Sequence, residues 1–293
     1  MDLCNARYVK ELMATFGLTF RKEWGQNFLT DHSAVERIAE SCGAGKPQTV
    51  LEIGAGAGAL TRELALRYKN VVAVEIDRGL IPLLEYVLED MNNVELVCGD
   101  IMKTDLVELL SPAFERGRVS VCANLPYYIT TPILLSLLDS SLPFKSITVM
   151  IQSEVADRLV ASPGTAEYGS VTAYLGYFGV VNKLFDVTAD KFLPPPKVDS
   201  TVVRIDLFDE KPYRPLDEAV FFRTLRASFG QRRKTLPNAL AAGFGELTKA
   251  KLAEAVVSAG FAPDVRGERL STADFVRLAD EITKLIAESK GQV

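Results

Sequence analysis

The sequence is poor in histidine and lacks paired cysteines, which excludes several kinds of catalytic and metal site. His32 is the only histidine in 293 residues, and it follows Asp31 in a turn that is typical of a helix cap. A Ser-His or Cys-His dyad would have to use His32, so nucleophilic catalysis of that kind is not expected. The four cysteines are scattered along the chain without a CxxC pair, and we predict no metal site from them.

Long hydrophobic runs are also missing. No apolar stretch approaches the roughly 20 residues that a membrane helix requires. The first residues, MDLCNARYVKELM, carry charges where a signal peptide would be apolar. We therefore expect a cytoplasmic protein that binds no membrane, and nothing in the sequence demands more than a monomer.

The chain as a whole lacks the excess of basic residues that usually marks a nucleic-acid partner, because its formal net charge is −5. One stretch, residues 221–240, differs from the rest. It contains no acidic residue and five cations, namely Arg223, Arg226, Arg232, Arg233 and Lys234. From this stretch alone, a solvated helical face and a nucleic-acid contact are equally good interpretations.

The pattern between residues 49 and 205 alternates short β-branched runs with helical periodicity, which predicts a parallel sheet covered by helices on both faces. The predicted strands are Thr49–Ile53, Val71–Glu75, Val94–Cys98, Val119–Ala123 and Ser146–Ile151. Two later strands, near Lys183–Val187 and Val198–Leu207, follow each other closely and predict an antiparallel pair at the end of the sheet.

Helical periodicity replaces the strand pattern in the last third of the chain. We therefore predict two domains, a catalytic α/β domain over residues 1–207 and a smaller helical domain over residues 208–293.

A glycine-rich turn follows the first predicted strand. In VLEIGAGAGALT, the strand runs into Gly54, Gly56 and Gly58 and then into a helix. Glycines at such a turn let the backbone approach a ligand closely, beside a helix N-terminus that favours negative groups. The alternatives are an ordinary tight turn and a dinucleotide site, although the latter prefers GxGxxG to the GxGxG found here.

Acidic residues stand at the ends of the next two predicted strands. Glu75 lies about 20 residues beyond the first glycine, where a carboxylate can accept both hydroxyls of a ribose. Asp100 ends the following strand and is suited to accept from an adenine amino group. Together with the glycine turn, they indicate a cofactor that contains adenosine.

The fourth strand ends in ANLPYY, the most specific motif of the chain. Asn124 offers an amide oxygen, Leu125 a backbone carbonyl beside the Pro126 turn, and Tyr127 an aromatic ring. Two acceptors and a flat ring are what is needed to hold an exocyclic amine and its base. The alternative is an Asn-Pro-type turn with tyrosines in the core.

Taken together, these motifs resemble those of the ribosomal RNA adenine dimethyltransferase family, and the resemblance covers nearly the whole chain. The matching segments include GQNFL, the glycine turn, VEID, NLPYY, MIQSEVADRL, SPGTAEYGS, FLPPPKVDSTVVR, SFGQRRKTL and ERLSTADF.

The resemblance implies a Rossmann-like class I methyltransferase sheet with a smaller all-helical C-terminal domain. It also implies transfer of methyl groups from S-adenosylmethionine to the 6-amino nitrogens of two adjacent adenines near the 3′ end of small-subunit ribosomal RNA. The cofactor ligands that it implies are Asn27, Leu29, Gly54, Gly56, Glu75, Ile76, Asp100, Ile101 and Asn124. The catalytic group that it implies is Asn124, Leu125, Tyr127 and Phe192, with Tyr127 and Phe192 flanking the target adenine.

Under this resemblance, the five cations of residues 221–240 are better explained as a contact with ribosomal RNA than as a solvated face. Three alternatives remain open. A large-subunit RNA adenine methyltransferase of the antibiotic-resistance type shares the same catalytic parts, and a ribosome-assembly factor could keep the fold without catalysis. A nicotinamide oxidoreductase fits less well, because the glycine spacing differs and no suitably placed histidine is available.

Overall fold

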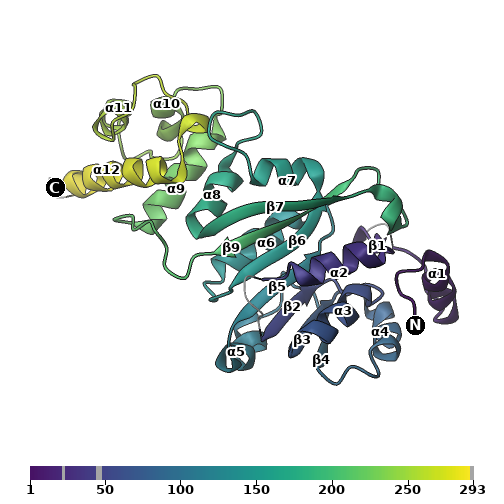
Figure 1. Ribbon diagram of the computed structural model, residues 1–293. Helices are drawn as coiled ribbons and strands as arrows, with labels where there is room; N and C mark the ends of the chain where they lie inside the picture. The colour runs from purple at the N-terminus through teal and green to yellow at the C-terminus, as the bar shows by residue number, and fades with distance from the viewer. Residues whose placement is uncertain (22–23, 44–47, 291–293) are drawn as a thin grey trace. The chain divides into compact units, whose positions relative to one another are not determined.

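The computed structural model describes residues 1–21, 24–43 and 48–290, and its central element is a seven-stranded sheet (Figure 1). The strands lie in the order β4-β3-β2-β5-β6-β9-β7. Their bounds are β2 Thr49–Ile53, β3 Asn70–Glu75, β4 Val94–Cys98, β5 Val119–Asn124, β6 Ser146–Gln152, β7 Gly179–Val187 and β9 Ser200–Leu207.

Five of these strands, β4, β3, β2, β5 and β6, run parallel, as the sequence predicts. Each begins and ends within one residue of its predicted bounds. Ile53 lies between Val74 on one side and Ala123 on the other, so the carboxyl ends of β2, β3 and β5 meet at one edge of the sheet. Every residue of β2 is buried, which requires covering layers on both faces because successive side chains point to opposite faces.

Beyond β6, the sheet continues with two strands from later in the chain, β9 and β7. β9 runs antiparallel to β6 and pairs Ser200 with Gln152, while β7 lies beyond β9 at the edge. The two late strands are neighbours at the end of the sheet, as predicted, while their antiparallel pairing with each other stays a prediction. β7 begins at Gly179, four residues before its predicted start, because the apolar residues that precede Lys183 continue the strand.

A second, two-stranded sheet was not predicted. β1 (Phe28–Leu29) pairs antiparallel with β8 (Phe192–Leu193), with Leu29 opposite Phe192. Strands of two residues leave no alternating pattern in a sequence. This pairing brings the segment after Trp24 against the segment that follows β7.

Helices surround the central sheet. Their bounds are α1 Ala6–Thr15, α2 His32–Glu40, α3 Ala59–Arg67, α4 Ile81–Val87, α5 Leu106–Arg116, α6 Thr130–Asp139 and α7 Ser153–Leu159, with short 3₁₀ turns at Arg78–Leu80 and Ala189–Lys191. A further 3₁₀ turn, Gly267–Arg269, lies in the C-terminal part of the chain. The predicted cap at Asp31 is confirmed, since its carboxylate accepts from the backbone N–H of Ala34 at 2.9 Å. Among the described residues, no helix combines the length and the apolarity needed to cross a bilayer.

The chain divides into two compact units. The first contains residues 1–156 and 181–209, and the second contains residues 157–180 and 210–293. The helices of the second unit are α8 Ser170–Phe178, α9 Glu218–Gly230, α10 Leu236–Ala241, α11 Lys249–Ser258 and α12 Thr272–Lys290. Its core is built from buried aromatic and aliphatic side chains such as those of Phe221, Phe244 and Phe275.

This division corrects the predicted domain boundary. The prediction placed all of residues 1–207 in the α/β domain, whereas residues 157–180 belong to the helical unit. Ala173 and Tyr177 of α8 are buried in the same core as Phe221 of α9. Because α8 contains no charged residue, its sequence carries no strongly polar face that would reveal which core it joins.

Candidate active site

The turn after β2 depends on its glycines. Gly54 and Gly56 have φ values of 80° and 58°, in the left-handed region that favours glycine. A Cβ atom on Gly56 would lie 3.2 Å from ring carbons of Phe28. The turn therefore leaves room for the segment that contains Phe28 to pass close by. The turn ends where α3 begins.

Glu75 ends β3 and faces this turn. Its Oε2 accepts from the backbone N–H of Gly56 at 2.9 Å, and its Oε1 accepts from that of Asp77 at 2.8 Å. Burial raises the pKa of the Glu75 carboxyl, while these two N–H groups act in the opposite direction. Each carboxylate oxygen keeps a second lone pair, so Glu75 can still accept hydroxyl groups of a ligand.

The motif after β5 is held from several sides. The Asn124 side-chain NH₂ donates to the carbonyl of Asn27 at 3.1 Å, which leaves its Oδ1 without a partner among the described residues. The N–H of Leu125 donates to the carbonyl of Met150 at 3.2 Å. Asn124 and Leu125 thus have fixed orientations at the carboxyl edge of the sheet.

Tyr127, which follows Pro126 in this motif, is half-buried. Its hydroxyl lies 2.8 Å from Oγ of Ser200 on β9, and burial raises its pKa. The ring is therefore held at its outer end by a hydrogen bond and is not a mobile surface group.

A cavity of about 80 Å³ lies between these groups. Of the predicted cofactor ligands, it is lined by Asn27, Gly54, Gly56, Glu75, Ile76 and Asn124. Leu125 and Tyr127 of the predicted catalytic group line the same cavity.

Four predicted site residues lie outside this lining. Leu29 and Phe192 form the β1–β8 pair and are buried in the core, although Leu29 lines a neighbouring hollow with Gly54 and Asn124. Asp100 and Ile101 follow β4 in a loop where Asp100 accepts from the N–H of Met102 at 3.0 Å. The roles of all four as ligand contacts stay predictions.

The N-terminal segment supplies cavity residues that were not predicted. Trp24, Gln26, Phe28 and, from the turn before α4, Leu80 line the cavity. Gln26 donates from its Nε2 to Oδ2 of Asp77 at 3.0 Å, which fastens the segment beside Glu75. No periodic pattern surrounds Trp24, so the local sequence does not indicate that this residue lines a cavity.

Glu52 was also missed. It lies on β2, is buried, and lines the hollow beside Gly54 and Asn124. Its Oε2 has no hydrogen-bond partner among the described residues. Burial raises the pKa of this carboxyl to about 8, and the charge of Glu75 acts in the same direction.

The five cations predicted to contact RNA fall into two groups. Arg223 forms two hydrogen bonds with the Glu246 carboxylate, and Arg232 pairs with Glu268 while donating to the carbonyls of Ala166 and Tyr168. These two arginines therefore have structural contacts within the helical unit.

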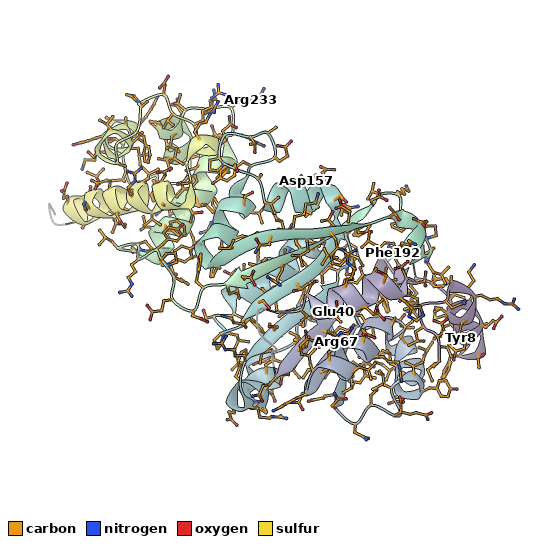
Figure 2. All side chains as sticks on the ribbon, in the orientation of Figure 1. Tyr8, Glu40, Arg67, Asp157, Phe192 and Arg233 are labelled. Carbon is orange, nitrogen blue, oxygen red and sulfur yellow. The ribbon has the colours of Figure 1, made fainter. Side chains whose placement is uncertain are left out.

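The other three cations have no such contacts. Arg226, Arg233 and Lys234 are exposed and have no ion-pair partner within residues 1–21, 24–43 and 48–290. Figure 2 labels Arg233 at the surface of the helical unit, with its guanidinium directed outward. They are the cations available to an anionic partner.

The fold and the cavity define a Rossmann-like methyltransferase, in which a ligand binds at the carboxyl edge of a mostly parallel sheet. The family model described as ribosomal RNA adenine dimethylase matches residues 17–284. The chain belongs to this family.

Similar proteins agree with this assignment. The chain is 42% identical over 283 residues to ribosomal RNA small subunit methyltransferase A of Shouchella clausii, with 96% of each chain covered. It is 42% identical over 287 residues to the protein of the same name from Ligilactobacillus salivarius, with 97% of each covered.

Two solved structures are also similar. A dimethyladenosine transferase from Plasmodium falciparum has a TM-score of 0.71 and 27% identity, covering 87% of this chain and 97% of that one. The 23S rRNA methyltransferase ErmE has a TM-score of 0.66 and 25% identity, covering 88% of this chain and 100% of that one.

Proposed function

We propose that the protein transfers methyl groups from S-adenosylmethionine to the 6-amino nitrogens of two adjacent adenines near the 3′ end of small-subunit ribosomal RNA. The observation that carries this proposal is the shared cavity. Asn124, Leu125 and Tyr127, which suit an aminopurine, line the same cavity as Glu75, which suits a ribose. The groups suited to the donor and those suited to the acceptor base therefore lie at one cavity.

The residues of the cavity fit the proposed donor. Glu75 would hold the ribose hydroxyls through its two remaining lone pairs, and the left-handed turn at Gly54 and Gly56 allows close approach of the backbone. Asn27 lines the same wall, and Asp100 is the proposed acceptor for the adenine amino group of the donor. When bound, the donor supplies a sulfonium methyl group as the electrophile.

The chain's contribution to the reaction is orientation of a weak nucleophile. The lone pair of the adenine 6-amino group is delocalised into the ring. Oδ1 of Asn124 and the carbonyl of Leu125 would accept its two hydrogens and favour a tetrahedral nitrogen, so no strong base is needed. Orientation and fixed dipoles then supply most of the acceleration.

The target base has to leave its stack, which costs a few kcal/mol. Stacking on Tyr127 would offset part of this cost, and Phe192 is the proposed second ring. Because Phe192 is buried beside β1, it would serve only if the base enters next to the β1–β8 pair. Arg226, Arg233 and Lys234 are the proposed RNA contacts of the helical unit.

The test is a methylation assay with unmethylated small ribosomal subunits and labelled donor, followed by nucleoside analysis. We expect dimethylated adenosine, and Asn124→Ala should lower kcat by roughly 100-fold or more. Asn182→Ala is the control, because this asparagine donates to Asp206 at the sheet edge and does not line the cavity. Full activity of the Asn124 variant would contradict the proposal.

The same assay separates the alternatives. Primer extension would map the methylated nucleotide to the small or the large subunit, the latter being the substrate named for the ErmE protein. The small-subunit substrate is favoured because the relatives at 42% identity carry that name, against 25% identity for the 23S enzyme. A protein that binds subunits without transferring methyl groups would instead be an assembly factor.

A further inference from the structure

The direction of β9 places its first residue at the edge of the sheet where the cavity lies. β9 is antiparallel to β6, so it begins where β6 ends, and Ser200 pairs with Gln152 at that end. Asn124 ends β5 at the same edge, opposite Met150 of β6. A residue from late in the chain thus reaches the motif that follows β5.

Ser200 is fully buried, with 0% of its surface exposed, and its Oγ lies 2.8 Å from the hydroxyl of Tyr127. A hydrogen bond at the end of a phenol ring restricts rotation about both of its side-chain torsions. Burial also excludes water that would otherwise compete for this bond. The plane of the Tyr127 ring is therefore set by the position of Ser200.

The strand around Ser200 is itself held in place. The hydroxyl of Thr201 lies 2.9 Å from Oγ of Ser153 and 2.6 Å from a carboxylate oxygen of Asp186 on β7. The N–H of Ser153 donates to the carbonyl of Asp199 at 3.1 Å. Ser200 is thus attached to a network that joins β9 to its neighbours, and it provides a fixed anchor.

We propose that Ser200 is a positioning residue for methyl transfer, which orients the Tyr127 ring so that the target adenine stacks with its amino group at Asn124. This inference rests on the proposed function. Ser200 touches neither substrate, so its loss should alter the reactive geometry and leave the affinity for the methyl donor unchanged. Subunit binding should also be preserved, because we assign it to exposed cations of the helical unit and not to this hydroxyl.

The first test is Ser200→Ala in the subunit methylation assay. We expect kcat to fall roughly three- to tenfold, the range that corresponds to one hydrogen bond. KM for subunits and Kd for S-adenosylmethionine should not change. Trp24, the single tryptophan, lines the cavity, and its fluorescence can report the Kd.

Ser120→Ala is the matched control. Ser120 is also fully buried, and its Oγ lies 2.9 Å from Oγ of Ser146, but it stands near the opposite edge of the sheet. Its loss should lower stability about as much as the loss of Ser200 and leave kcat unchanged. A merely structural role of Ser200 would make the two variants alike in both measurements.

A double-mutant cycle with Tyr127→Phe completes the test, because this variant keeps the ring and removes only the hydroxyl. Tyr127→Phe alone should lower kcat by a similar factor, and adding Ser200→Ala should have no further effect. Wild-type kcat in Tyr127→Phe, or independent multiplicative losses, would overturn the inference even if Ser200→Ala does not fold. If the wild-type protein methylates no adenine, the proposed function fails instead, so the two failures are distinguishable.

Discussion

Glu52 and Glu75 show how burial and hydrogen bonding give different properties to two carboxylates on neighbouring strands. Both are buried, but Glu75 accepts two backbone N–H groups, whereas Oε2 of Glu52 has no partner among the described residues. Glu75 is therefore prepared to act as a charged acceptor. Glu52 is instead best accommodated as the neutral acid.

For Glu75, we expect Glu75→Ala to weaken binding of S-adenosylmethionine by at least tenfold. The physical reason is the loss of hydrogen bonds to a charged acceptor, each worth about 1.5–3 kcal/mol. Isothermal titration calorimetry would measure the change. The control is Glu85→Ala on the exposed side of α4, and undiminished affinity of the Glu75 variant would exclude this carboxylate as a donor contact.

For Glu52, we expect an unusual dependence of stability on pH. Folding raises its pKa from 4.5 to about 8, so between these values the folded protein holds a proton that the unfolded chain releases. The contribution of Glu52 to the free energy of unfolding therefore decreases as pH rises from about 4.5 to 8, and it is constant above that.

Glu52→Gln should remove this dependence. Relative to the wild type, its stability should improve as pH rises from 5 to 8, by on the order of a few kcal/mol in total. Urea unfolding at several pH values would measure it, with the exposed Glu89→Gln as control. Parallel stability curves for Glu52→Gln and the wild type would show that the site is not protonated in the folded state.

At the scale of elements, the start of α3 requires a residue without a side chain at position 58. Gly58 caps α3 with a φ of 86°, and a Cβ atom there would lie 2.9 Å from a methyl group of Val87. Gly58→Ala should therefore lower the free energy of unfolding by about 2–4 kcal/mol, from backbone strain and overpacking together.

Denaturant unfolding would measure this loss. Gly245→Ala is the control, because a Cβ atom there meets nothing within 4 Å, and its effect should stay within about 0.5 kcal/mol. Equal stabilities of the two variants would contradict the expected strain at Gly58.

The elements that could be predicted are those whose residues carry a local pattern. The β-branched runs of β2 to β6 specify five parallel strands, and their ends identify Glu75 and Asn124 as site residues. β1 and β8 have only two residues each, which is too short for an alternating pattern of apolar and polar residues to be recognised. Their pairing depends on residues more than 160 apart, as the contact of Thr30 with the Lys191 carbonyl illustrates.

The parts of the site that could not be predicted depend on long-range contacts in the same way. Tyr127 and Ser200 are separated by 73 residues, and an isolated serine has no pattern that would reveal its partner. Phe192 was assigned to the site through family resemblance, but its ring packs in the core beside β1. Sequence motifs thus identified the groups at the strand ends, and tertiary packing determines which of them face the cavity.

At the scale of the whole molecule, we expect some cations of the helical unit to affect RNA binding and others to affect stability. Replacing Arg226, Arg233 and Lys234 with alanine should weaken binding to small subunits and make its dependence on salt shallower. Each phosphate contact contributes about 0.7 to the slope of log affinity against log salt concentration, so losing three contacts should change that slope by about 2. Filter binding at several salt concentrations would measure it, and an unchanged slope would remove these residues from the RNA contact.

Arg232→Ala should behave differently, because this arginine holds Ala166 and Tyr168 within the helical unit. We expect a lower melting temperature with little change in the salt slope. A loss of salt dependence without a loss of stability would assign Arg232 to the RNA contact instead.

The helical unit is assembled from two separate stretches of chain, so the peptide backbone crosses between the units after residues 156, 180 and 209. A single protease cut after Asp209 would leave two fragments that stay entwined, because α8 remains on the first fragment while its buried partners lie on the second. The fragments should co-elute from a sizing column until a denaturant separates them. For the same reason, expression of residues 1–207 alone would expose the side chains of α8 that are buried in the helical unit. We expect this shortened protein to aggregate.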